Sequence, residues 1–174
     1  MFLIKHDKEK LEDNLDEELV VHIDGELHNF NELKKRFGLA CHKDEGLIKE
    51  LYRIDPQNFE SYLIGNYVIA IFDYKTGNFC LIRDHFGTKP IYYYHNYGLF
   101  CYSSEIKYIR CFPIKDLSPN IKKIVNYLTQ YKPNSSETFF NEILSLEPST
   151  KLTFDGKSTA LKKYECNQDY SFKG

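Results

Sequence analysis

The sequence has no tryptophan, a single methionine, and no apolar run that approaches the ~20 residues needed to cross a membrane. Its mean hydropathy is −0.50. The apolar start, Met1 to Ile4, gives way to charge at Lys5, which makes it too short for the core of a signal peptide. We therefore expect no membrane partner.

An excess of positive charge is also missing. The chain carries 23 Lys and Arg against 25 Asp and Glu, a formal net charge of −2. Such a balance does not favour nucleic acid. The tyrosines at 92, 93, 94 and 102 suggest a base-stacking platform as an alternative, but tyrosines in strands more often pack and hydrogen-bond. We expect no nucleic-acid partner.

The five cysteines, at 41, 80, 101, 111 and 166, lack the spacing of a disulfide framework or a zinc site. Their number is odd, and no two are separated by only two residues. This usage indicates reduced thiols in a cytoplasmic protein, with no metal and no cofactor. The chain also has no glycine-rich phosphate loop, so we do not expect it to bind ATP by itself.

What is present indicates one folded domain, because 42% of the 174 residues are hydrophobic and 16% are aromatic. Apolar and turn patterns predict strands at 18–24, 67–72, 79–82, 91–94, 99–102 and 151–154. Helix signals occur near 31, at Asp44 as N-cap, at Pro56, at Ser104, at Ser118 and near 139–144. The middle strands read as a four-strand meander, and 67–72 is apolar enough to be covered on both faces. These patterns predict an α+β protein with an antiparallel sheet covered by helices.

Two segments carry a resemblance to a known family. One is Asp24-Gly-Glu-Leu-His-Asn-Phe, and the other is Arg83-Asp-His-Phe-Gly-Thr-Lys-Pro-Ile-Tyr-Tyr93 with Ser104-Glu-Ile-Lys107 after it. In order and spacing they resemble the N-terminal class II glutamine amidotransferase domain of asparagine synthetases. The resemblance implies a four-layer αββα sandwich of the N-terminal-nucleophile hydrolase type, partly truncated at the N-terminus. It assigns 18–165 to this domain, 1–17 to a degenerate N-terminal segment and 166–174 to a tail or linker.

The resemblance also implies that the catalytic apparatus is degraded. The family's nucleophile is an N-terminal Cys whose α-amine serves as the base, and Phe2 stands at its place. The family's oxyanion donor is an Asn, and Asp24 stands there, where an ionised carboxylate cannot donate a hydrogen bond. The family's longer N-terminal segment, with an Arg for the glutamine carboxylate, has no counterpart. We therefore expect no catalytic residue and no glutaminase activity from the chain on its own.

The remaining residues of the segments that carry the resemblance, together with Asp44, form two groups. Asp24, Gly25, Glu26 and Asp44 match the family's glutamine pocket and would form its vestige. Asp24 to Glu26 have a plain alternative, an ordinary strand-to-helix turn. The second group is expected to be structural, an ionic latch around a turn, and comprises Arg83, Asp84, Gly87, Lys89 and Pro90, followed by Ser104 and Glu105.

We interpret the chain as a catalytically degenerate amidotransferase-like domain. It would be a scaffold or subunit of an asparagine-synthetase-like, ATP-dependent amide-forming system, with a synthetase domain or subunit as partner. An apolar docking patch is expected near Ser104 to Arg110 and after Phe139. Two alternatives stay open: a free-standing binding or regulatory protein whose acidic pocket takes an amine, and an active glutaminase whose true start lies upstream.

Overall fold

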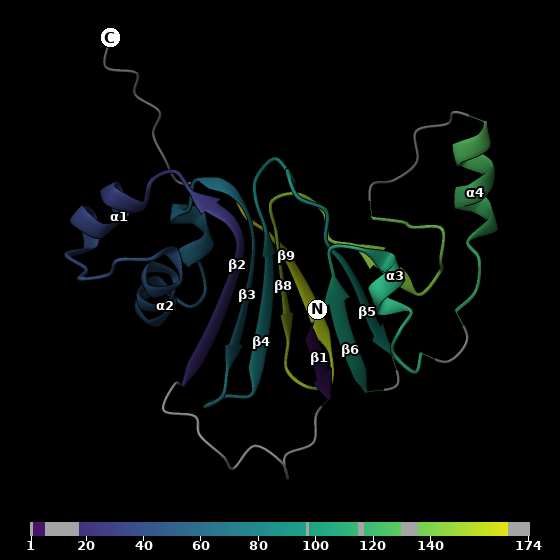
Figure 1. Ribbon diagram of the computed structural model, residues 1–174, viewed down its shortest axis with the longest axis horizontal. Helices are drawn as coiled ribbons and strands as arrows, with labels where there is room; N and C mark the ends of the chain where they lie inside the picture. The colour runs from purple at the N-terminus through teal and green to yellow at the C-terminus, as the bar shows by residue number, and fades with distance from the viewer. Residues whose placement is uncertain (1, 6–17, 97, 115–116, 130–135, 167–174) are drawn as a thin grey trace.

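Two antiparallel sheets lie face to face and carry helices on their outer sides (Figure 1). The computed structural model describes residues 2–5, 18–96, 98–114, 117–129 and 136–166. The larger sheet has the order β2 (Leu19–Leu27), β3 (Gly65–Asp73), β4 (Asn78–Arg83), β8 (Thr150–Phe154) and β9 (Thr159–Lys163). The smaller has the order β1 (Phe2–Lys5), β6 (Leu99–Ser103), β5 (Tyr92–Asn96) and β7 (Ile143–Ser145).

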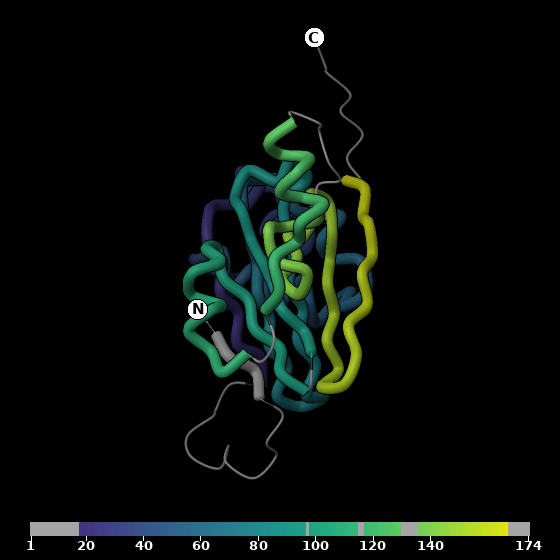
Figure 2. Tube along the Cα trace, turned by 90° about the vertical axis from the view of Figure 1, so that its right-hand side faces the viewer, coloured from purple at the N-terminus to yellow at the C-terminus, as the bar shows by residue number. Residues whose placement is uncertain are grey.

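The helices complete four layers, which confirms the αββα sandwich. On the large sheet lie α1 (Phe30–Phe37), α2 (Asp44–Ile54) and the short 3₁₀ helix η1 (Phe59–Tyr62). On the side of the small sheet lie α3 (Ile106–Ile109) and α4 (Ile121–Leu128). Figure 2, turned by 90° so that the right-hand side of Figure 1 faces the viewer, shows α4 in front of the two sheets.

Alternation along β3 explains why the layers pack. Tyr67 and Ile69 belong to the core beneath the helices, whereas Val68 and Ala70 belong to the core between the sheets. Both sets are buried, so the expectation that 67–72 is covered on both faces is confirmed. A third cluster, around Ile109, fills the space under α3.

The predicted meander is wrong at one point: β4 and β5 are not neighbours. β3 and β4 pair in the large sheet, and β5 and β6 pair in the small one. The chain therefore crosses from one sheet to the other between Arg83 and Tyr92. Periodicity could not reveal this, because a two-sheet sandwich and a single sheet give strands the same alternation.

Residues 24–26 do not form a strand-to-helix turn. The β2–β3 ladder continues through Gly25, opposite Tyr67, to Leu27, opposite Gly65. Gly25 has φ +129°, and a Cβ there would come within 1.9 Å of the Asn66 carbonyl oxygen. Glycine is needed at this position because the neighbouring backbone leaves no room for a side chain.

Three helix starts also differ from the predictions. Lys43, not Asp44, occupies the N-cap of α2, because the Asp44 carboxylate accepts a hydrogen bond from Leu27 N at 3.1 Å. Asn120, not Ser118, caps α4 by accepting from Lys123 N at 3.0 Å. Pro56 does not begin a helix, since the next element is the short 3₁₀ helix η1, which begins at Phe59.

Residues 139–144 contain no helix. Phe140 forms a bridge with Pro119, and β7 begins at Ile143. Of the degenerate N-terminal segment expected at 1–17, the structure describes residues 2–5. Among the residues that are described, no helix is both long and apolar enough to span a membrane.

Candidate functional site

A cavity of about 350 Å³ lies between the two sheets, where β2 faces β6. Its polar lining comes from His22 and Asp24 of β2, Ser103 and Ser104 at the end of β6, and Tyr108 of α3. Tyr102 also lines it, and the β1–β6 ladder sets Phe2 opposite Tyr102. The register of β1 therefore sets the position that the resemblance assigns to the nucleophile directly across from one residue of the cavity lining.

Asp24 is held by an ion pair. Lys89 Nζ donates to Asp24 Oδ1 at 2.6 Å, with the two side chains 36% and 51% exposed. Lys89 sits on the connection that crosses from β4 to β5, so the pair joins that connection to the large sheet. The carboxylate is thus neutralised by a group of the protein itself.

The other three residues of the expected vestigial pocket point elsewhere. Gly25 is a backbone position in the ladder, as described above. Glu26 is mostly exposed and lies 3.6 Å from His28 Nε2. The Asp44 carboxylate accepts a hydrogen bond from Leu27 N. Of the four residues, Asp24 alone lines the cavity.

Arg83 and Asp84 brace the crossing connection through its backbone. The Arg83 guanidinium donates to the carbonyl oxygens of Lys89 at 2.7 Å, Leu146 at 2.6 Å and Gly87 at 2.8 Å. The fully buried Asp84 carboxylate accepts from the backbone N–H groups of Phe86 and Thr88 and from the Thr88 hydroxyl. Arg83 and Asp84 thus bind backbone and hydroxyl groups, whereas Lys89 pairs with Asp24. The structural role expected for Arg83 and Asp84 stays a prediction.

Space around the connection is tight. Gly87 has φ +63°, and a Cβ there would lie 2.7 Å from Pro148 and 3.1 Å from the Arg83 guanidinium carbon. Pro90 and Ser104 line the cavity, and Glu105 pairs with Lys107 at 2.6 Å just before α3.

Replacing Arg83 with lysine should lower the free energy of unfolding by about 2–3 kcal/mol, because an ammonium cannot reproduce a planar fork aimed at three carbonyls. Urea denaturation of both proteins measures the difference. Arg53→Lys is the matched control, since Arg53 makes an exposed pair with Glu50 and should lose under ~1 kcal/mol. Equal losses in the two variants would contradict the role given to Arg83.

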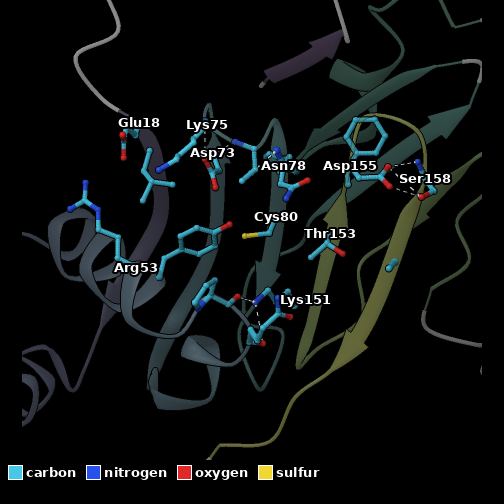
Figure 3. A pocket seen from close by; sticks show the side chains of 18 residues that line it. Glu18, Arg53, Asp73, Lys75, Asn78, Cys80, Lys151, Thr153, Asp155 and Ser158 are labelled. Atoms are coloured by element: carbon cyan, nitrogen blue, oxygen red, sulfur yellow. Dashed lines mark hydrogen bonds between the residues drawn. The ribbon is translucent and has the colours of Figure 1, made fainter.

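A larger cavity, of about 580 Å³, opens on the outer face of the large sheet. Cys80 of β4 and Thr153 of β8 lie on its floor, between Lys151 at one end and Asp73 at the other (Figure 3). None of the expected site residues lines it. Its volume exceeds that of the inter-sheet cavity, but it lies on the other side of the sheet from Asp24's cavity.

A buried ion pair beside this larger cavity is not among the residues expected from the sequence. Lys151 Nζ donates to Glu60 Oε2 at 2.9 Å and to the Pro56 carbonyl at 2.7 Å. The two side chains are 5% and 0% exposed. The sequence offered no signal for it, because Lys151 alternates with the apolar Leu152 and Phe154 of the core between the sheets and so reads as a solvent-facing residue of the strand.

The cysteines cannot supply a nucleophile to the inter-sheet cavity. None of the five lines it. Burial raises the pKa of the Cys80 and Cys101 thiols to about 12, so both are protonated at neutral pH and unreactive. In the part of the chain that the structure describes, no group of His, Cys, Asp and Glu is arranged to hold a metal ion.

Comparison with solved structures supports the fold. The chain resembles a glutamine phosphoribosylpyrophosphate amidotransferase from B. subtilis, complexed with ADP and GMP, with a TM-score of 0.57 and 14% identity. The match covers 95% of this chain and 32% of that one. A structure described as the allosteric regulatory enzyme of purine biosynthesis matches with a TM-score of 0.56 and 14% identity over 86% of this chain and 29% of that one.

Comparison with protein sequences identifies relatives. A Methanocaldococcus jannaschii protein named as a glutamine-hydrolysing asparagine synthetase is 30% identical over 88% of this chain and 31% of its own length. Asparagine synthetase 2 of Bacillus subtilis is 35% identical over 54% of this chain and 13% of its own length. This chain thus spans about a third or less of these relatives. The family model of the glutamine amidotransferase domain matches residues 11–165, and the chain belongs to that family, in its class II branch.

Proposed function

We propose that this domain is a catalytically inactive member of its family and acts as a scaffold or subunit of an ATP-dependent, amide-forming system of the asparagine-synthetase kind. The observation that carries the proposal is the Asp24–Lys89 pair. At the place where the resemblance expects a neutral donor for an oxyanion, a carboxylate lines the cavity and is fixed by a lysine at 2.6 Å.

The chemistry supports this reading. A carboxylate accepts hydrogen bonds and repels a developing oxyanion, whereas loss of a single oxyanion donor alone costs about 3–4 kcal/mol of transition-state stabilisation. Phe2 offers no nucleophilic atom at the strand position beside Tyr102. No arginine lines the inter-sheet cavity among the described residues, so an α-carboxylate there would lack a bidentate partner.

The partner follows from the relatives. Those matched over this domain carry about two thirds or more of their length outside the match, and their names describe asparagine synthesis. A domain that retains the fold without the hydrolytic groups has a binding role left to it. We therefore propose that it associates with an ATP-dependent synthetase unit.

The test is an ammonia assay. The purified protein should release no ammonia from glutamine above the buffer blank, and Phe2→Cys should not change this, because Asp24 still occupies the donor's place. Asp24→Asn in the same background measures what the carboxylate contributes. Ammonia release by the unaltered protein, blocked by a glutamine analogue that alkylates thiols, would overturn the proposal.

The alternative of an amine ligand has a weaker basis. An amine would have to displace Lys89 from Asp24, and Glu26 and Asp44 do not line the cavity. A thermal-shift screen with amino acids and polyamines separates the two ideas, since only a ligand-binding protein shows a concentration-dependent rise in melting temperature.

A further inference from the structure

Among the described residues the two sheets have four edge strands, and β2 differs from the other three. β1 and β7 have four and three residues, and β9 has five and carries Lys162 and Lys163. Short edge strands and edge lysines are devices that discourage pairing with another chain. β2 ends the large sheet (Figure 1), is nine residues long and contains neither lysine nor proline. This edge is therefore long enough for a further strand and is not protected by these devices.

The main-chain groups of β2 point alternately toward β3 and away from it. At one end, Tyr74 N donates to Glu18 O at 2.9 Å. At the other end, His28 N donates to Ile64 O at 2.7 Å. In an antiparallel ladder such bonds recur at every second residue, so the even-numbered residues of β2 bond to β3. The odd-numbered residues turn their N–H and C=O groups off the sheet, and we call those that precede Gly25 the β2 edge: Leu19, Val21 and Ile23.

The last odd-numbered residue of β2 shows that groups on this side accept a partner from outside the sheet. Leu27 N donates to the Asp44 carboxylate at 3.1 Å. In the part of the chain that the structure describes, no strand lies beside β2 on this side, and the three residues of the β2 edge have no counterpart of Asp44. Their N–H and C=O groups are therefore available to an incoming strand.

The two faces beside the β2 edge differ in character. Val21 and Ile23 lie on the helix side and are only partly buried against the core there. On the other side, His22 and Asp24 line the inter-sheet cavity, and Glu26 is mostly exposed. An incoming strand would extend both faces, so its residues should be apolar toward the helices and polar toward the small sheet, in alternation.

The charge of the polar face distinguishes between partners. Glu18, just before β2, lies on this face with Asp24 and Glu26. Lys89 is paired with one of these three carboxylates, Asp24. Cross-strand pairs of opposite charge stabilise a sheet, whereas like charges destabilise it. A second copy of β2 would bring the same acidic face with it, so the β2 edge favours a different chain with basic residues at these positions.

We propose that the β2 edge binds an extended protein segment in which apolar and basic residues alternate, and that this segment pairs antiparallel with β2. Every described strand pair of the two sheets is antiparallel, and this pairing is slightly the more stable per residue. Strand addition of this kind takes its affinity from main-chain hydrogen bonds and its specificity from alternate side chains. It does not depend on the proposed loss of catalysis, so the ammonia assay and the binding experiments below fail independently.

Amide exchange measured by NMR tests the site residue by residue. The probe is a heptapeptide of alternating valine and lysine with valine at both ends, acetylated and amidated. In the free protein the amides of Val21 and Ile23 should exchange fast, and those of Val20 and His22, which bond to β3, slowly. The peptide should protect the first two amides. Protection of these amides without peptide, which would mean that the edge is already occupied, or no protection with it, would overturn the proposal.

Altered peptides test the chemistry and the direction of the segment. Glutamate in place of lysine should weaken binding at least about tenfold, because it sets like charges beside the acidic face. In the antiparallel arrangement the valines turn their N–H groups toward β2. N-methylation of two inner valines should therefore abolish the protection, whereas N-methylation of two lysines should preserve it. Equal binding of the glutamate peptide, or the reverse result with the methylated peptides, contradicts the proposed segment.

Ile23→Pro tests the same contact from the side of the protein. Proline removes the N–H that faces the incoming strand and leaves the bonds of the even-numbered residues to β3 in place. Ile23→Ala is the matched control, because it loses the side chain and keeps the N–H. Ile23→Pro should bind the peptide at least about tenfold more weakly than Ile23→Ala, with circular dichroism showing that both are folded. Equal affinities would count against the proposal, and the methylated peptides decide it if Ile23→Pro does not fold.

Discussion

Replacing Lys151 with methionine should lower the free energy of unfolding by about 3–5 kcal/mol, because it leaves a carboxylate buried without its cation. Glu60 is fully buried and Lys151 is its hydrogen-bonded partner at 2.9 Å. Glu60 Oε1 accepts no hydrogen bond among the described residues, and Lys162 Nζ lies 3.8 Å from it. Lys162 Nζ donates its hydrogen bonds to the Gln57 carbonyl and to Asn58 Oδ1, so it does not replace the hydrogen bond from Lys151. Urea denaturation at neutral pH gives the difference.

Two further variants make this result interpretable. The double variant Lys151→Met/Glu60→Met removes both charges and should recover most of the loss, since apolar replacements of a buried pair are often neutral. Glu50→Gln breaks an exposed pair with Arg53 at 2.6 Å and should cost under ~1 kcal/mol. If Lys151→Met lowers the free energy of unfolding no more than Glu50→Gln does, the Lys151–Glu60 pair does not contribute to stability in the way proposed.

Replacing Gly25 with alanine should destabilise the domain by roughly 3–5 kcal/mol and open the end of the β2–β3 ladder. The new Cβ would lie 1.9 Å from the Asn66 carbonyl oxygen at a φ of +129°. Gly65, on the facing strand β3, is equally restricted: a Cβ there would lie 2.2 Å from the Glu26 carbonyl oxygen of β2. The two backbones therefore approach each other here too closely for any side chain.

Gly77→Ala is the matched control for this substitution. Gly77 also has a positive φ, +73°, but no atom lies within 4 Å of its Cβ position. It should cost only the conformational strain, about 1–2 kcal/mol. Thermal and urea unfolding of both variants compare the two costs. Equal losses would show that strain alone, not the close approach of β2 and β3, explains the effect at Gly25.

Local patterns sufficed for those parts of the fold that burial determines residue by residue. The run from Tyr67 to Phe72 is apolar because both faces are covered, and its strand follows directly. The exchange of sheets between Arg83 and Tyr92 has no such signature. It depends on a guanidinium and a carboxylate that satisfy the backbone of one connection, and the sequence shows only that both residues are present.

The resemblance singled out individual residues of the candidate site, but only the structure shows which of them are in contact. Asp24 and Lys89 were both singled out from the sequence, but their contact spans 65 positions along the chain, and no spacing rule links them. Asp44 illustrates the opposite failure. Aspartate is a favoured residue at a helix N-cap. In this fold, however, the Asp44 carboxylate accepts a hydrogen bond from Leu27 N of the neighbouring strand β2 and does not cap the helix.

The three carbonyls bound by Arg83 have a consequence for what can enter the inter-sheet cavity. One belongs to the approach to β5 and another directly follows β7, whereas Arg83 itself ends β4. A single side chain therefore joins the end of a large-sheet strand to backbone next to two strands of the small sheet. Pro90 and Ile91 of the braced connection line the inter-sheet cavity, so Arg83 holds this part of its wall in place and a bound molecule would have to fit the space that the wall leaves.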